Sequence, residues 1–204
     1  MSVYWLSVYR HYHQFQLGLD GSAHCVTRFH KKPGQVRCQN KVKTKLIDKS
    51  IHPEYRKLRV LAKNRDEKKG VGLADLALLS TEEGLSSGGL DLTSKTPAQV
   101  IELIRSKKCY IYGTAEGRFR GVHISSKFQS QFSYNQNLIL LKNEEKHGLR
   151  TGDSGGPLIC FDESNKAEVV GLASFKDTKD KLFGFTYVGE ENKEWALKMT
   201  LFAP

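Results

Sequence analysis

Four short apolar runs limit the folds open to this chain more than any other feature. They cover residues 108–113, 137–141, 168–173 and 183–188, and turn or charged residues bound each of them. Apolar runs of this length are typical of strands, because helices in globular proteins usually need about ten residues or more. We therefore predict a mostly β protein whose strands fold back on one another.

Two segments depart from this pattern. Residues 98–104 fit either one or two helical turns or a strand, and residues 190–201 fit a helix. The Gly/Ser-rich stretch 84–89 is the best candidate for a linker. A chain of 204 residues suits one domain built from two small halves. We predict a first half over residues 1–84 and a second half over residues 85–204, closed by the C-terminal helix.

Basic residues are concentrated in one stretch. The net charge is +10, and residues 28–69 hold 15 Lys and Arg against 4 Asp and Glu. We interpret this segment as a solvated face or loops, because its basic residues follow no helical stripe. The alternative is contact with a polyanion such as nucleic acid, a sulfated sugar or an anionic membrane. Only Phe29 and Tyr55 are available there to stack on bases.

The sequence gives no sign of a membrane segment. No stretch approaches the roughly 18 consecutive apolar residues of a membrane span. The first nine residues lack a basic leader and a small-residue cleavage site, so we identify no signal peptide.

The chain has four cysteines, Cys25, Cys38, Cys109 and Cys160. They form no C-x-x-C pair, and the histidines do not have the spacing of zinc ligands, so we predict no metal site. An even number of cysteines favours disulfides in an oxidising compartment, with free thiols as the alternative. The residues alone leave three pairings open.

The strongest chemical signal is the string Thr151-Gly-Asp-Ser-Gly-Gly-Pro-Leu158. Its glycines permit a tight turn that lets Ser154 project and lets backbone N–H groups converge on one point. A serine hydroxyl needs a base to accept its proton and donors to hold the oxyanion formed by its attack. We predict Ser154 as a nucleophile, with the N–H groups of Gly152 and Ser154 forming the oxyanion hole. The alternative is a Gly-rich turn with an incidental serine.

The same string fits the G-x-S-x-G nucleophile turn of α/β-hydrolases, in which the histidine follows the serine. No histidine follows Ser154 in this chain, so the α/β-hydrolase fold is excluded. The seven histidines are His11, His13, His24, His30, His52, His123 and His147.

Asp75 is the candidate for the carboxylate that orients the base. It lies inside the apolar run 71–79, where a buried charge is costly unless it is paired. We expect it to accept the Nδ1–H of a histidine, which turns Nε2 toward the serine. The alternative is that strand alternation turns Asp75 to water. For the base, His24 lies among small residues and His52 lies in a proline turn; the resemblance described next favours His24.

The chain resembles the chymotrypsin/trypsin family of serine endopeptidases, whose triad appears in the order His, Asp, Ser. Similar strings run in order from about residue 20 to the end of the chain. They are Ser22-Ala-His-Cys25, Ile51-His-Pro-Glu-Tyr55, Asp75-Leu-Ala-Leu-Leu79, Gly152-Asp-Ser-Gly-Gly-Pro157, Gly171-Leu-Ala-Ser-Phe175 and Glu194-Trp-Ala-Leu197. The resemblance implies an all-β fold of two antiparallel six-stranded β-barrels, the first complete or incomplete, with a C-terminal helix. It also implies a triad of His24, Asp75 and Ser154.

Substrate-binding positions follow from the same resemblance. They are Gly148, Leu149, Ser174, Phe175, Lys176 and Gly184. Gly148 matches the pocket floor and carries no acid, so cleavage after Lys or Arg is not favoured. Leu149 and Gly184 imply an open, mostly apolar pocket. Lys176 replaces a glycine of the family, so it either attracts an acidic substrate residue, narrows the cleft or lies at the surface.

The resemblance also bears on the cysteines and on Asp153. Cys109 and Cys160 match positions that pair in the family, which implies a Cys109–Cys160 disulfide. Cys25 and Cys38 either pair or stay free. The family pairs the aspartate before the nucleophile with the amine of an Ile-Val-Gly-Gly terminus, a string absent here. Asp153 therefore needs another cation, or the oxyanion hole is not assembled, or the chain is a fragment.

Together these features predict a serine endopeptidase that acts on protein or peptide substrates through an acyl-enzyme. We expect a monomer without cofactor or metal, secreted or periplasmic by resemblance. The alternative is a catalytically silent homologue that serves as a binding module, with residues 28–69 contacting a polyanion or a protein partner.

Overall fold

The computed structural model describes most of the chain. The residues it describes are 2–6, 26–29, 36–40, 46–81, 90–113, 120–133, 136–144, 148–150 and 152–201. The expected linker 84–89, the candidate base His24 and Cys25 lie outside these residues. The division of the chain near residue 84 therefore stays a prediction.

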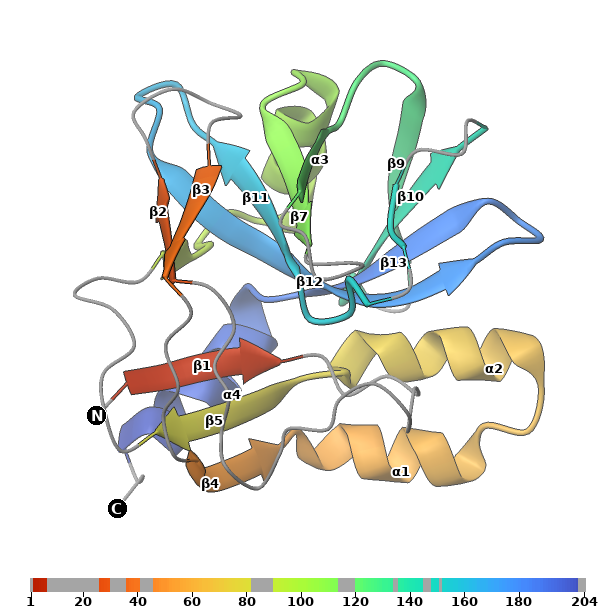
Figure 1. Ribbon diagram of the computed structural model, residues 1–204. Coiled ribbons are helices and arrows are strands. Elements are labelled where there is room, and N and C mark those ends of the chain that lie inside the picture. Colours follow the sequence, from red (N-terminus) through yellow and green to blue (C-terminus); the bar gives the residue numbers. More distant parts are fainter. Residues whose placement is uncertain are drawn as a thin grey trace.

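One large curled sheet dominates the structure (Figure 1). Its strands follow the order β8-β7-β11-β12-β13-β10-β9, each antiparallel to its neighbours, and β6 joins β12 in parallel. The strands are β6 (Asp91–Leu92), β7 (Cys109–Gly113), β8 (Arg120–His123), β9 (Phe128–Ser133), β10 (Leu138–Asn143), β11 (Pro157–Phe161), β12 (Ala167–Asp177) and β13 (Leu182–Tyr187). The four apolar runs correspond to β7, β10, β12 and β13, so these predicted strands are confirmed.

Two smaller sheets come from the first part of the chain. The strands β1 (Ser2–Leu6), β5 (Ala77–Thr81) and β4 (Leu46–Ile51) form an antiparallel sheet in the order β1-β5-β4. The strands β2 (Val26–Phe29) and β3 (Val36–Asn40) form a separate antiparallel pair. The mostly β fold is confirmed, although the large sheet has eight strands and one parallel pairing instead of six antiparallel strands.

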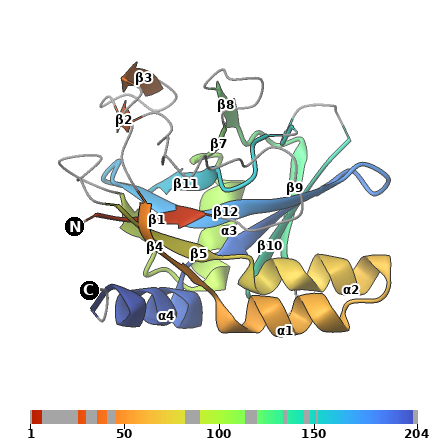
Figure 2. The same cartoon turned by 60° about the horizontal axis from the view of Figure 1, so that its bottom comes forward.

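A helical hairpin covers one end of the molecule, and the sequence analysis did not predict it. The helix α1 (Pro53–Leu61) begins with a proline, whose missing N–H is harmless in the first turn. The helix α2 (Arg65–Gly70) begins with a capping box, in which Asn64 and Glu67 satisfy each other's backbone N–H groups. The 3₁₀ helix η1 (Val71–Ala74) follows directly and leads to Asp75. In Figures 1 and 2, α1 and α2 lie side by side at the edge of the fold.

Two further helices settle the segments that depart from the strand pattern. Residues 98–104, for which the sequence allowed either helical turns or a strand, form part of the helix α3 (Pro97–Arg105). A Thr96–Gln99 capping box starts it, and Val100 and Ile104 pack into the core below the large sheet. The helix α4 (Glu190–Leu201) confirms the predicted C-terminal helix.

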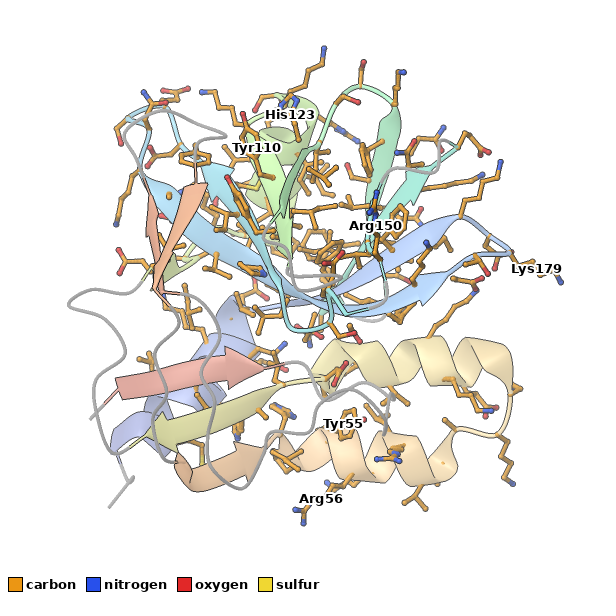
Figure 3. All side chains as sticks on the ribbon, viewed as in Figure 1. Tyr55, Arg56, Tyr110, His123, Arg150 and Lys179 are labelled. Atoms are coloured by element: carbon orange, nitrogen blue, oxygen red, sulfur yellow. A yellow bond between two sulfur atoms is a disulfide. The ribbon has the colours of Figure 1, made fainter. Side chains whose placement is uncertain are left out.

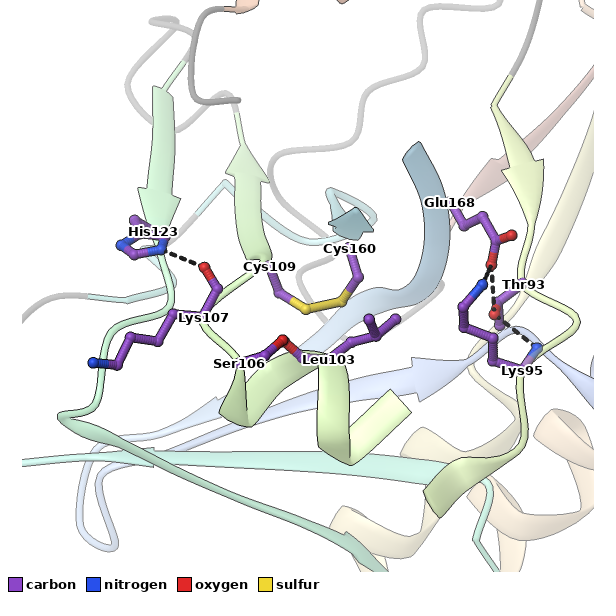
Figure 4. The surroundings of a disulfide bond; sticks show 9 residues. All are labelled: Thr93, Lys95, Leu103, Ser106, Lys107, Cys109, His123, Cys160 and Glu168. Atoms are coloured by element: carbon purple, nitrogen blue, oxygen red, sulfur yellow. Dashed lines mark hydrogen bonds and ion pairs between the residues drawn. A yellow bond between two sulfur atoms is a disulfide. The ribbon is translucent and has the colours of Figure 1, made fainter. Parts of the chain in front are cut away.

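The core lies inside the curl of the large sheet. Its fully buried side chains include Ile111, Leu141, Leu158 and Phe185. The predicted Cys109–Cys160 disulfide is confirmed, and it joins residues that face each other directly on β7 and β11 (Figure 4). Because it links residues 51 apart, it stabilises the fold by about 4 kcal/mol on chain-entropy grounds.

Among the described residues, no helix is both long enough and apolar enough to span a lipid bilayer.

Candidate active site

The candidate nucleophile Ser154 lies in a tight turn just before β11. Gly152 and Gly155 on either side have φ of 97° and 80°, a region that side chains other than glycine rarely enter. The turn is anchored to β12, because Gly155 N–H donates to Ala173 O at 2.8 Å and Ala173 N–H donates to Gly156 O at 2.9 Å. Ser154 itself is half-buried, so its hydroxyl is held on a fixed backbone and reaches the surface.

The glycine two residues after Ser154 is needed for a close backbone approach. A Cβ at Gly156 would lie 2.2 Å from Tyr112 O on β7. Any side chain would therefore push the turn away from the large sheet. The sequence signal of Gly-Gly after the serine thus reflects two different constraints, a left-handed backbone at Gly155 and a contact at Gly156.

The backbone N–H groups of Gly152 and Ser154 belong to the same turn. Within the described ranges, no acceptor receives a hydrogen bond from the N–H of Gly152 or of Ser154. Most buried or half-buried N–H groups in proteins are paired, so two unpaired donors in one turn are available for an oxygen of a ligand. The oxyanion hole expected from these two residues stays a prediction.

Asp153 points away from these donors and into the protein. It is 1% exposed, and its Oδ2 accepts a 2.7 Å hydrogen bond from Arg150 N–H, while Arg150 O accepts one from Asp153 N–H. Its carboxylate lies against Gly113 at the end of β7, where a Cβ would come within 2.0 Å of Oδ1. The carboxylate therefore fixes the backbone on the N-terminal side of Ser154.

Asp75 is fully buried and hydrogen-bonded, not turned to water. It is 0% exposed and follows η1, and Ser174 Oγ on β12 donates to its Oδ2 at 2.6 Å. Ser174 adjoins Ala173, the residue that anchors the nucleophile turn. The structure thus brings Asp75 and the turn of Ser154 to the same stretch of β12.

Two hydrogen bonds hold the segment before Asp75, one from the large sheet and one from the C-terminal helix. Thr186 Oγ1 on β13 donates to Gly72 O, and Asn192 Nδ2 on α4 donates to Leu73 O at 3.4 Å. A Cβ at Gly72 would lie 3.1 Å from Ser174 Oγ, so η1 packs directly on β12. The carboxylate is therefore positioned by residues from three distant parts of the sequence.

His52, the rejected alternative for the base, has a structural environment. Its ring packs edge-on against Trp195 of α4 with centroids 4.7 Å apart, and its Nδ1 is buried without a hydrogen-bond partner in the described part of the chain. Burial lowers the pKa of His52, although the carboxylates of Glu54 and Glu191 raise it somewhat. This environment favours a packing role for His52, and the choice of His24 as the base stays a prediction.

The expected substrate-binding residues gather at one end of β12 and β13. Phe175 is paired with Gly184 and Lys176 with Phe183. Gly148 and Leu149 are buried beside them, and Lys176 is exposed with its Nζ 6.0 Å from the centre of the Phe183 ring. Ser174, the sixth expected residue, contacts Asp75 instead of open space.

Aromatic rings lie against both glycines of the expected pocket. A Cβ at Gly148 would lie 2.3 Å from the Phe183 ring, and a Cβ at Gly184 would lie 2.2 Å from the Phe175 ring. Phe183 is 4% exposed and packs in the same core cluster as Leu149. The Cβ directions of both glycines therefore point at aromatic rings, and the expected open apolar pocket stays a prediction.

Two residues of this region were missed by the sequence analysis. Gly113 ends the predicted strand 108–113, and its place against Asp153 gives no local sequence signal. Phe183 starts the predicted strand 183–188, and the sequence analysis assigned it no role at the site. Which glycine it would cover depends on the pairing of distant segments.

Comparisons with known proteins agree with this geometry. The family model described as Trypsin matches residues 22–195, which include the nucleophile turn, Asp75 and β12. A search of curated proteins found no match. Because the family model covers most of the sequence, the chain belongs to the trypsin family.

Proposed function

We propose that this protein is a serine endopeptidase with Ser154 as nucleophile, His24 as general base and Asp75 as the carboxylate that orients the histidine. The observation that carries the proposal is the buried Asp75, which β12 holds next to the turn of Ser154. Burying a carboxylate in the protein interior costs free energy unless the carboxylate pairs with a cation or accepts a hydrogen bond from an N–H donor. Membership of the trypsin family supports the same assignment.

The reaction follows from these roles. Ser154 Oγ attacks the carbonyl carbon of the peptide bond as His24 Nε2 accepts the hydroxyl proton, and Asp75 stabilises the resulting imidazolium. The N–H groups of Gly152 and Ser154 receive the oxyanion. The C–N bond then breaks, and His24 gives its proton to the leaving amine. Water, deprotonated by His24, attacks the acyl-enzyme and releases the carboxylic acid with free Ser154.

The contacts around Gly148 also bear on specificity. Because Phe183 fills the space over Gly148, we expect a substrate with a small residue before the cleaved bond. We expect protein or peptide substrates, a monomer, and a secreted or periplasmic location. The Cys109–Cys160 disulfide supports an oxidising compartment.

The second candidate is a catalytically silent homologue that acts as a binding module. The observation that favours it is the filled space at Gly148, which leaves less room for a substrate side chain. The two candidates differ in the reactivity of Ser154, since a silent module has no activated hydroxyl.

One experiment separates them. The parent chain and the variants Ser154→Ala, Asp75→Asn and His24→Ala are treated with a fluorophosphonate and with a mixed peptide library read by mass spectrometry. Ser164→Ala, an exposed serine on the β11–β12 turn, is the matched control. We expect full labelling and cleavage by the parent and the control, and none by Ser154→Ala. Asp75→Asn should be slower by about 10⁴-fold, the scale already known for this family, and His24→Ala should lose most of its activity. Absence of labelling in the parent would favour the binding module.

A further inference from the structure

The outer face of α1 exposes two large apolar side chains next to each other. Val60 is 83% exposed and Leu61 is 67% exposed, and they are two of the three exposed large hydrophobic residues in the described ranges. Single apolar residues at a surface are common and need no explanation. Here two of them lie within one turn of a helix that also carries exposed cations, which together form a mixed apolar and basic surface.

The direction of this face follows from helix geometry. Tyr55 and Leu58 of α1 pack against Val71 and Ala74 of η1, so they define the buried side. With 3.6 residues per turn, Arg56, Lys57 and Val60 lie on the opposite side. Figure 3 shows Arg56 projecting from α1 away from the body of the protein, while Tyr55 points inward. Val60 therefore shares this face with cations, and Leu61, which lies 100° further round the helix, is at the edge of the face.

The hairpin that carries this face has a surplus of positive charge. Residues 53–70 contain seven Lys and Arg against three Asp and Glu. The acids Glu54 and Glu67 are engaged within the hairpin, by Lys57 Nζ at 2.7 Å and by the cap of α2. In the part of the chain that the structure describes, the side chains of Arg56, Lys63 and Lys68 make no ion pair. These cations are available to an anionic partner.

The combination of charge and apolar groups selects the partner. Nucleic acids need cations and stacking platforms, but the only aromatic residue of α1, Tyr55, is 3% exposed. A sulfated sugar uses the cations alone and gives no role to Val60 and Leu61. An anionic bilayer uses both, because cations bind its headgroups while apolar side chains enter the boundary below them.

We propose that the outer face of α1, formed by Arg56, Lys57, Val60 and Leu61 with Lys63, docks this protein on an anionic lipid bilayer. The face contains none of the candidate catalytic residues. The proposal is therefore independent of the proposed peptidase activity, and the Ser154→Ala variant is expected to bind as the parent does.

The test is co-sedimentation of the whole chain with vesicles of phosphatidylcholine, with and without about one-third phosphatidylserine. We expect binding only to the anionic vesicles, and loss of binding at high salt. Each cation near an anionic bilayer strengthens binding about fivefold, so Arg56→Gln/Lys63→Gln should weaken it on the order of twentyfold. Val60→Ser/Leu61→Ser, which leaves every charge in place, should weaken it about tenfold.

Two controls separate this face from general charge and from misfolding. Arg105→Gln removes an exposed cation from the last turn of α3, which lies at the other end of the molecule from α1 (Figure 1), and should leave binding unchanged. Val60→Trp places a fluorophore on the face, and brominated anionic lipids should quench its emission. This second readout detects direct contact even where the double serine variant is unstable.

Several results would overturn the proposal. These are absence of binding by the parent, equal loss with Arg105→Gln, or no quenching of Val60→Trp. Binding of the double serine variant as tight as the parent's, together with equal competition by heparin or duplex DNA, would show a polyanion site instead of a bilayer site.

Discussion

Ser174 Oγ donates a 2.6 Å hydrogen bond to Asp75 Oδ2 at a point where both residues are buried. The two residues are 99 apart in the sequence, and the bond joins the end of η1 to the middle of β12. It ties the carboxylate to the strand that also anchors the turn of Ser154. The position of Asp75 is therefore a property of the packed protein and not of its local sequence.

Removing this hydroxyl should affect both stability and rate. Ser174→Ala leaves a buried carboxylate oxygen without one of its donors, so we expect the free energy of unfolding to fall by about 1–3 kcal/mol. If Asp75 orients the base, kcat should fall more than KM changes. Urea unfolding and peptide hydrolysis measure the two effects. Thr186→Val, which removes the buried hydroxyl bonded to Gly72 O, is the control; an equal loss of kcat there would argue against a specific role for Ser174.

The substitution Gly113→Ala, which lies outside the nucleophile turn, should displace that turn. The new Cβ would lie 2.0 Å from Asp153 Oδ1, so the carboxylate must move and the backbone at Gly152 and Ser154 must move with it. We expect loss of fluorophosphonate labelling while circular dichroism still reports a folded protein. Gly171→Ala is the control, because its Cβ would lie 3.1 Å from its nearest neighbours and it should keep most of the labelling. Full labelling of Gly113→Ala would show that Asp153 does not position the turn.

Phe183→Ala should open the space over Gly148. The lost packing is expected to reduce the free energy of unfolding by about 3–5 kcal/mol, as for other buried aromatic residues. Cleavage should shift from small residues before the cleaved bond toward Leu and Phe, which the new space accommodates. Peptide-library profiles of parent and variant measure this shift. Phe185→Leu, elsewhere in the same core cluster, is the control for general loosening, and an equal change in its profile would contradict the assignment.

Stability should depend on the ionisation of His52. Burial against Trp195 holds the pKa of His52 below its usual value of 6.5, despite the carboxylates of Glu54 and Glu191. The unfolded chain therefore takes up this proton first as the pH falls. The neutral His52 therefore contributes fully to the free energy of unfolding above about pH 6.5. This contribution declines as the pH falls toward the pKa of His52 in the folded protein, and it levels off below that pKa.

Replacing this histidine isolates its contribution. His52→Phe keeps a ring against Trp195 but cannot be protonated, so its melting temperature should fall less than the parent's between pH 7.5 and pH 5. Melting curves across this range measure the difference. Parallel pH profiles for the two proteins would mean that His52 titrates normally in the folded state.

The sequence determined the features that arise within short segments. Apolar runs bounded by turn residues predicted β7, β10, β12 and β13, and the pattern of residues 190–201 predicted α4. The glycines around Ser154 predicted a tight turn, and the resemblance to the trypsin family supplied the Cys109–Cys160 pair. These signals are local because backbone preferences and strand periodicity act over a few residues.

The tertiary structure alone decided the rest. The proline that starts α1 and the capping box that starts α2 are local signals. However, this basic segment with few apolar residues has too little periodicity to predict a helical hairpin, and the packing of Tyr55 on η1 stabilises it. The burial of Asp75, the contact of Asp153 with Gly113 and the covering of Gly148 by Phe183 each join segments distant in sequence. No local pattern specifies them, because they depend on which strands pair and in which register.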